Sequence, residues 1–442
     1  MKNYIYWITF VAVNGGLLFG LNMAGISGAV TSIKQIFSLT DNGIGIVVGS
    51  IMLGCLIGAL VAGSLADKYG RKQVMVLISL IFIFSSIGCA LAQSSWILIL
   101  SRFISGIGVG LVSVVCPMYI SEVAPAEKRG RLVSYFQFAI TLGILLAYVF
   151  NFIFAGMQDS WRFMLGIPFV FGSLFLLFLL ISFPESPRWL IARKKSEEAL
   201  KVLTRIGGVD FAKKECKEIE NSISSEKNKE KVKVSEIFKG KVGGIVFLGI
   251  CLAIFQQLSG INAVVNYAPV IFEKIGFGKE MALLQSVLVG VINFLATILA
   301  LWLVDSKGRK SLLLWGAIGM TVSLAYLALS FAFGWSSVGI LISLLMYILF
   351  YAASFAPVFW VITSEIFPNR VRAVALSFTT AVIWFSSFLA VQFSPFILNK
   401  FGGAFLFGLF GLVSLIAFLF VYYKIPETKG KSLEEIEKEL GL

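Results

Sequence analysis

The chain has 442 residues, of which 58% are apolar and only 14% are charged, a composition that excludes an ordinary soluble globular protein. The net charge of +13 would suit a nucleic-acid-binding protein, but the basic residues are scattered over the junctions between apolar runs. That distribution is typical of a membrane protein with positively charged cytoplasmic loops, so we expect no nucleic-acid partner.

Apolar runs of roughly twenty residues follow one another along the whole chain, each long enough to cross a bilayer as a helix. The first run is too long, and too closely followed by others, to be a cleaved signal peptide. The sequence therefore predicts an all-α membrane protein with twelve transmembrane helices. The runs are 4–30, 44–66, 73–92, 96–119, 132–155, 163–183, 241–268, 281–304, 311–333, 338–363, 373–397 and 403–423.

The only long polar segment, 184–240, lies between the sixth and seventh runs. Its amphipathic stretch 199–206 and mixed Lys/Glu sequence predict short helices on the cytoplasmic face, with a flexible portion near 221–232. The division predicted is a first bundle at 1–183, this linker at 184–240, a second bundle at 241–424 and a tail at 425–442. Basic residues place both termini in the cytoplasm, and we expect the plasma (inner) membrane.

Three short motifs occur once in each half of the chain. ADKYGRK at 66–72 returns as VDSKGRK at 304–310, SEVAP at 121–125 returns as SEIFP at 364–368, and PES at 184–186 returns as PET at 426–428. Parallel repeats of six spans are typical of transporters whose site lies between the halves.

The repeated motifs place charged residues at the cytoplasmic ends of helices. Asp67 is expected to form a compact charged junction with Arg71 or Lys72. Glu122 and Glu365 each end a helix beside an arginine cluster, and such pairs could hold the two bundles together in one state and part in another. The alternative is that they only anchor helices. The predicted network is Asp67, Arg71, Glu122, Arg129, Arg131, Asp305, Arg309, Glu365, Arg370 and Arg372.

The motifs together resemble the sugar porter family of the major facilitator superfamily, and the resemblance runs from end to end. It implies a fold of two pseudo-symmetric six-helix bundles. It also implies relatives among the glucose facilitators and the bacterial xylose and glucose–proton symporters. The motifs are GLLFG at 16–20, ADKYGRK at 66–72, RFISGIGVG at 102–110, YISEVAPAEKRG at 119–130, PESPRWL at 184–190, QQLSGINAVVNYAP at 256–269, VDSKGRK at 304–310, SEIFPNRVR at 364–372 and PETKGKSLEEIE at 426–437.

Substrate contacts are expected from polar residues that apolar helices have no structural reason to contain. Amide side chains both donate and accept hydrogen bonds, which suits sugar hydroxyls, and an aromatic face packs against a pyranose. A helix break at Ser259-Gly260 would let Gln256 and Asn262 face one cavity. The alternative for each amide is an interhelical hydrogen bond. With the resemblance, the predicted contacts are Gln137, Gln256, Gln257, Asn262, Asn266, Asn293, Trp360 and Trp384.

The resemblance also bears on energy coupling. Proton-coupled sugar porters have Asp in an FGYD pattern of the first helix, partnered by an arginine at the position of Arg102, whereas this chain reads FGLN at 19–22 and has Asn22. All carboxylates map to loops or helix ends, and there is no His. We expect Asn22 and Arg102 to form a neutral hydrogen bond; the alternative is an Arg102 that snorkels to the interface.

The function expected is therefore alternating-access facilitated diffusion of a monosaccharide, such as the hexose glucose. The alternatives are a proton- or cation-coupled sugar symporter and, less favoured, a non-transporting sugar receptor. No set of nucleophile, acid and base indicates an enzyme. The five cysteines show no disulfide or metal spacing, so we expect no cofactor and no metal. A functional monomer in contact with lipid is also expected.

Overall fold

The computed structural model of the chain contains twelve helical segments long and apolar enough to cross a membrane, counted over the residues that it describes. It describes residues 2–125, 128–227, 238, 240–368, 371–429 and 435. The twelve spans predicted from the apolar runs are confirmed. Helices are the expected solution because hydrocarbon offers the backbone no hydrogen-bond partner.

The first half of the chain forms six spans and then three short helices. Thr40 and Ser94 cap the second and fourth spans, since their hydroxyls accept the N–H groups of Gly43 and Ile97. The elements are α1 (Lys2–Ala24), η1 (Ser27–Ala29), α2 (Val30–Ile36), α3 (Asp41–Tyr69), α4 (Arg71–Ala90), α5 (Ser95–Val123), α6 (Arg129–Phe154), α7 (Ser160–Ser182), α8 (Pro187–Ala192), α9 (Ser196–Gly207) and α10 (Val209–Lys227).

The short helices α8 to α10 confirm the helical linker, but the flexible portion expected near 221–232 is partly wrong. Residues 221–227 continue α10 as a helix, and the rest of that portion lies outside the described residues. The second half contains α11 (Gly240–Leu258), α12 (Ile261–Lys274), α13 (Lys279–Lys307), α14 (Arg309–Phe333), α15 (Ser337–Ala353), α16 (Phe355–Ile366), α17 (Arg372–Lys400) and α18 (Gly402–Lys424).

Glycines let neighbouring helices of the first half approach backbone to backbone. A Cβ added at Gly54 of α3 would lie 2.1 Å from the carbonyl oxygen of Phe103 on α5, and one at Gly106 would lie 2.1 Å from that of Ile51. Small residues at helix crossings are the usual basis of packing in lipid, where the hydrophobic effect does not drive association. The α3–α5 pair is thereby fixed as a close, rigid unit.

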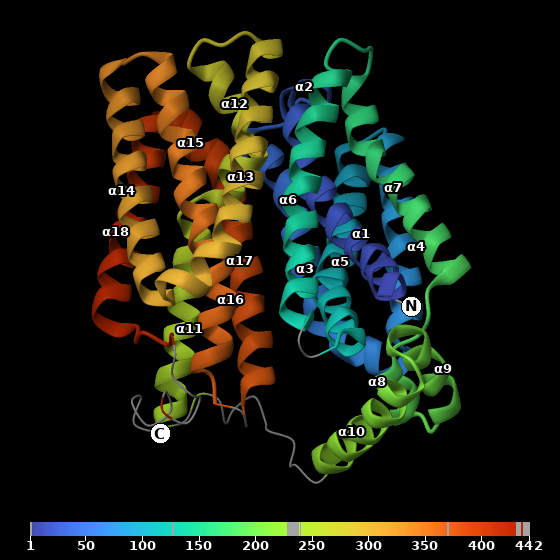
Figure 1. Cartoon of the computed structure of the whole chain (residues 1–442). Coiled ribbons are helices and arrows are strands. Elements are labelled where there is room, and N and C mark those ends of the chain that lie inside the picture. The colour runs from blue at the N-terminus through green and yellow to red at the C-terminus, as the bar shows by residue number, and fades with distance from the viewer. Residues whose placement is uncertain are drawn as a thin grey trace.

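The spans form two side-by-side groups, α1 to α7 and α11 to α18, with α8 to α10 below the first group in Figure 1. The groups meet where α3 packs on α17 and α6 packs on α13. At the first contact, a Cβ on Gly45 would lie 2.2 Å from the carbonyl oxygen of Gln392. The two bundles predicted from the repeated motifs are confirmed.

Polar contacts join the two bundles at the end remote from α8 to α10. Asn399 at the end of α17 donates to a carboxylate oxygen of Asp41 at 2.6 Å, and Gln392 donates to the carbonyl oxygen of Asn42 at 3.1 Å. Thr31 of α2 donates to Glu273 of α12 at 3.3 Å. These contacts close the remote end in this conformation.

Candidate functional site

Two helices of the second bundle break at the level of its polar side chains. Gly260, between α11 and α12, has φ of +95°, and a Cβ there would lie 2.3 Å from the ring of Phe410. This position therefore requires glycine, and the break predicted at Ser259-Gly260 is confirmed. The second break, at Ser354, separates α15 from α16. Gln256 connects the two breaks, because its Nε2 donates to the carbonyl oxygen of Phe355 at 3.1 Å.

The amides on either side of the first break form a continuous hydrogen-bonded set. Asn262 donates to Gln257 Oε1 and to Ser387 Oγ of α17, both at 2.8 Å. Asn266 donates to the carbonyl oxygen of Asn262 at 2.8 Å. The structure thus brings three amides and one hydroxyl from α11, α12 and α17 into one hydrogen-bonded set.

Three buried polar atoms of this region have no hydrogen-bond partner among the described residues: Gln256 Oε1, Asn266 Oδ1 and Trp384 Nε1. Buried polar groups are normally paired, so each unpaired one needs an explanation. Two acceptors and one donor without formal charge match an uncharged ligand that both donates and accepts. The arrangement suits hydroxyl groups better than a carboxylate or an ammonium group.

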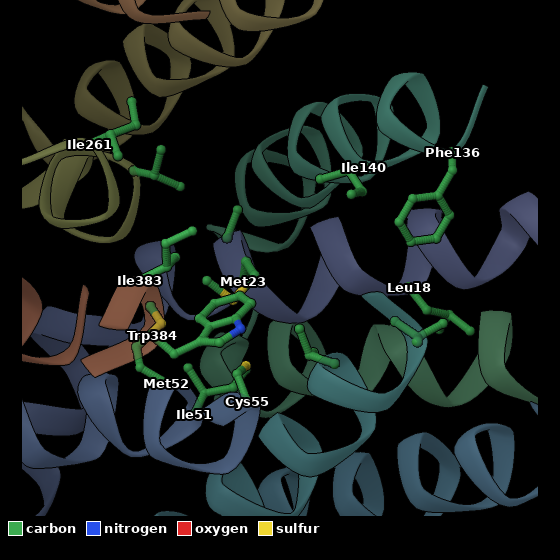
Figure 2. Close-up of a cluster of buried hydrophobic side chains, with 14 of the residues drawn as sticks. Leu18, Met23, Ile51, Met52, Cys55, Phe136, Ile140, Ile261, Ile383 and Trp384 are labelled. Atoms are coloured by element: carbon green, nitrogen blue, oxygen red, sulfur yellow. The ribbon is translucent and has the colours of Figure 1, made fainter. Parts of the chain in front are cut away.

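Trp384 lies where the two bundles face each other. Figure 2 shows its indole beside Met23 and Met52, which belong to α1 and α3 of the first bundle, with Ile383 from its own helix. The ring also lies 6.0 Å from that of Phe19, centroid to centroid. The aromatic surface is therefore shared between the two bundles.

The remaining predicted contacts lie on other helices. Gln137 is half-buried on α6, and Asn293 is buried on α13, the helix that packs against α6. Trp360 on α16 is 45% exposed and meets the ring of Phe359 edge-on. The part that these three side chains play in ligand binding stays a prediction.

Arg102 and Asn22 meet, but not through both side chains. Arg102 Nη1 donates to the main-chain oxygen of Asn22 at 2.8 Å. The Asn22 amide instead donates to the carbonyl oxygen of Leu18 at 2.8 Å and accepts from Ser105 Oγ at 2.6 Å. A hydrogen bond between the two residues is present, but its acceptor is the main-chain oxygen and not the side-chain amide that was expected. The snorkelling alternative is wrong, because Arg102 is only 2% exposed.

At the end of the first bundle that bears α8 to α10, Arg71 is the centre of a charged junction. Its guanidinium contacts Glu122 at 2.8 Å and Asp67 at 3.1 Å, which confirms the Asp67–Arg71 pair. Glu185 accepts the backbone N–H groups of Arg71 at 2.9 Å and Lys72 at 3.2 Å, at the start of α4. Burial raises the pKa of Glu185, while these N–H groups and the Arg71 charge oppose the rise.

The second bundle repeats this junction with the equivalent residues. Arg309 contacts Glu365 at 3.1 Å, and Glu427 accepts the N–H groups of Arg309 at 2.9 Å and Lys310 at 3.1 Å. Ser186 in the first junction and Thr428 in the second donate to Glu122 and Glu365 respectively. The repeated motifs of the sequence therefore form repeated structures.

The predicted pairing of Glu122 with Arg129 and Arg131 is wrong. Glu122 pairs with Arg71, whereas Arg129 and Arg131 are exposed and Arg131 donates to the hydroxyl of Tyr135 at 3.1 Å. Arg71 can contact Glu122 because the turn at the start of α4 lies beside the end of α5, where Glu122 is located. Glu365 pairs with Arg309, and whether Arg370 also contacts it lies outside the described residues. Arg372 donates to the carbonyl oxygen of Phe367 at 3.1 Å.

Two members of the predicted network, Arg370 and the side chain of Asp305, lie outside the part of the chain that the structure describes. The sequence had not indicated the roles of Glu185, Ser186, Glu427 and Thr428, although the PES and PET repeat was the available signal.

Two helical bundles around a polar site, with helices broken at that site, define a secondary transporter. The family model described as sugar (and other) transporter matches residues 8–440, and the chain belongs to this family. It is a sugar transporter of the major facilitator superfamily and not an enzyme, and the resemblance seen in its motifs is confirmed.

Relatives match over nearly the whole chain. An arabinose-proton symporter of Bacillus subtilis (strain 168) is 38% identical over 443 residues, covering 98% of this chain and 95% of that protein. The glucose transporter GlcP of Staphylococcus epidermidis is 39% identical over 447 residues, covering 100% and 98%. The inward-open structure of the xylose transporter XylE from E. coli gives a TM-score of 0.88 at 36% identity, covering 99% and 100%.

Proposed function

We propose that this protein carries a monosaccharide, most favourably a hexose such as glucose, by facilitated diffusion. The observation that supports this most is the set of unpaired neutral atoms, Gln256 Oε1, Asn266 Oδ1 and Trp384 Nε1, beside two helix breaks. A sugar has hydroxyls that can satisfy the acceptors and oxygens that can satisfy the donor. The chemistry of the site favours an uncharged polyol over an ion.

The site is proposed to open to alternate sides of the membrane. In this conformation the bundles are joined at the remote end through Asp41 with Asn399 and through Thr31 with Glu273. The ion pairs at the other end join elements within each bundle, so they do not tie the bundles to each other. We take this as an inward-facing state, with both termini cytoplasmic, of a transporter that works as a monomer in the plasma membrane.

Absence of proton coupling is proposed from the first bundle. A coupled carrier needs a group whose protonation changes inside the membrane, most often a carboxylate or a His. Here Asn22 occupies the position beside Arg102, and its amide does not titrate. Sugar would then move down its own gradient only.

A second candidate, proton symport, has observations of its own. The relatives named above include an arabinose-proton symporter at 38% identity, and a D-xylose-proton symporter of Escherichia coli is 36% identical. Within the chain, Glu273 is a half-buried carboxylate at the contact between the bundles. A proton bound there would weaken its contact with Thr31 and so couple protonation to opening.

The proposal is tested by exchange of labelled glucose in proteoliposomes loaded with unlabelled sugar. Competition by a panel of hexoses, pentoses and inositol ranks the substrates without requiring any gradient. We expect saturable exchange that hexoses inhibit more strongly than inositol. No exchange of any monosaccharide by correctly folded protein would overturn the proposed function, and inhibition by pentoses alone would replace the hexose.

A further inference from the structure

Tyr148 of the first bundle reaches into the second bundle through a buried hydrogen bond. Its side chain is 1% exposed on α6, and its hydroxyl donates to the main-chain oxygen of Val265 on α12 at 2.7 Å. A glycine makes room for the ring, because a Cβ added to Gly290 of α13 would lie 2.9 Å from it. Figure 1 shows α13 beside α6, so this one side chain contacts two helices of the other bundle.

The acceptor of this bond is a carbonyl group that its own helix leaves free. In an α-helix the carbonyl of Val265 would accept from the N–H group four residues later, which is the position of Pro269. Proline has no N–H group, so that helical bond cannot form. A buried carbonyl without a partner is costly, and Tyr148 supplies the donor from the first bundle.

The same chemistry recurs inside the second bundle. Tyr267 of α12 donates at 3.1 Å to the carbonyl oxygen of Val391, which lies four residues before a proline of α17. Tyr347 of α15 donates at 2.9 Å to the carbonyl oxygen of Ser259, in the break between α11 and α12. Of these three tyrosines, Tyr148 alone joins one bundle to the other. A rigid-body movement of the bundles would therefore break its bond and leave the other two.

The bond between Tyr148 and Val265 lies on the helix that connects the amide site to the remote end. Val265 directly precedes Asn266, whose Oδ1 is buried and unpaired among the described residues. Further along α12, Glu273 accepts from Thr31 of the first bundle. The Tyr148 bond thus lies between the proposed sugar site and the contacts that close the remote end.

We propose that Tyr148 is a positioning residue of the transport cycle, which holds α12 against the first bundle while the remote end is closed. This inference rests on the proposed alternating access. When the bundles part on that side, the Val265 carbonyl loses Tyr148 and accepts from water that enters the opening. Because the bond exists in only one of the two states, it biases the equilibrium toward the inward-facing state.

The test measures the distance between the bundles at the remote end by double electron–electron resonance, with the full chain in lipid nanodiscs and without sugar. Spin labels are attached through Gln158→Cys and Glu280→Cys, two exposed positions after α6 and at the start of α13. The half-buried Cys216 and Cys251 are first replaced by Ser. We expect Tyr148→Phe to raise the ratio of the longer to the shorter distance about fivefold, as the loss of one hydrogen bond should.

Two further variants make the result specific to this bond. Pro269→Ala gives α12 the N–H group that the Val265 carbonyl lacks, so in that background Tyr148→Phe should change the ratio by about twofold or less. Tyr347→Phe is the matched control, because it removes the same kind of bond within one bundle and should leave the ratio unchanged.

An unaltered ratio in Tyr148→Phe would overturn the proposal. An undiminished rise in the Pro269→Ala background would overturn it too, and so would an equal rise in Tyr347→Phe. The distances are measured without sugar, so they are independent of the substrate. Failure of glucose exchange in proteoliposomes would instead overturn the proposed function, and the distances would still report on the bond.

Discussion

Replacing Gln256 by Ala tests the proposed sugar site at its best-defined residue. In the structure Gln256 Nε2 donates to the Phe355 carbonyl oxygen at 3.1 Å, and Oε1 is buried and unpaired. Removing one partner of a buried hydrogen bond costs about 1–3 kcal/mol. If Oε1 accepts from the sugar, the variant should bind sugar roughly tenfold to a hundredfold more weakly.

The same change has a stability cost that must be separated from binding. The Phe355 carbonyl loses its partner at the α15–α16 break, so the variant should melt earlier even without sugar. At a sugar concentration of 100 times the parent Kd, bound sugar stabilises the parent by about 2.7 kcal/mol. With Kd weakened tenfold to a hundredfold, the same concentration should stabilise the variant by only about 0.4–1.4 kcal/mol.

The assay is thermal melting of purified protein with and without sugar, together with direct titration of binding. Asn14→Ala is the matched control, since the Asn14 amide donates to the Phe10 carbonyl oxygen within its own helix at 2.7 Å. It should leave sugar affinity unchanged. Earlier melting of Gln256→Ala with unaltered sugar affinity would refute the reasoning and reduce Gln256 to a link between two helix breaks.

Three further changes address the framework. In denaturation, Glu122→Gln should destabilise the fold by about 3 kcal/mol and Glu365→Gln by about 1 kcal/mol. The Arg71–Glu122 pair is more buried, with side chains 8% and 9% exposed, than the Arg309–Glu365 pair, with side chains 16% and 24% exposed. The reverse order would contradict the buried pairing. Asp41→Asn weakens contacts that close the remote end. If the closed state thereby loses about 1 kcal/mol of stability, cysteine labelling of the cavity from that side should increase about fivefold. Unaltered labelling would show that these contacts do not hold the closed state. Gly260→Ala should lower the melting temperature, because φ is +95° and the Phe410 ring leaves no room; parent-like melting would count against a required glycine.

The spans and their repetition could be predicted from the sequence because lipid leaves the backbone few choices. An apolar run of sufficient length must form a helix, and a motif repeated at a helix end must form the same junction twice. Gly70 and Gly308 show this, with φ of +97° and +90° and with Glu185 and Glu427 docked against them.

Side-chain pairing could not be predicted in the same way. Glu122 is closer along the chain to Arg129 than to Arg71, but the fold places the start of α4 beside the end of α5. The direction of the Asn22 amide was also open, because its oxygen and nitrogen have several partners within reach. Such choices depend on the packing of whole helices, which local sequence does not specify.

The central proposal is that this transporter moves sugar without protons, since the residue beside Arg102 is Asn22, whose amide does not titrate. The most direct measurement imposes a pH gradient across sealed proteoliposomes and follows labelled glucose and internal pH together. We predict that sugar reaches equal concentrations on both sides and that its entry leaves internal pH unchanged, whereas Asn22→Asp makes transport depend on pH. Accumulation of sugar by the unmodified protein above the external concentration, abolished by a protonophore, would contradict the account and establish symport.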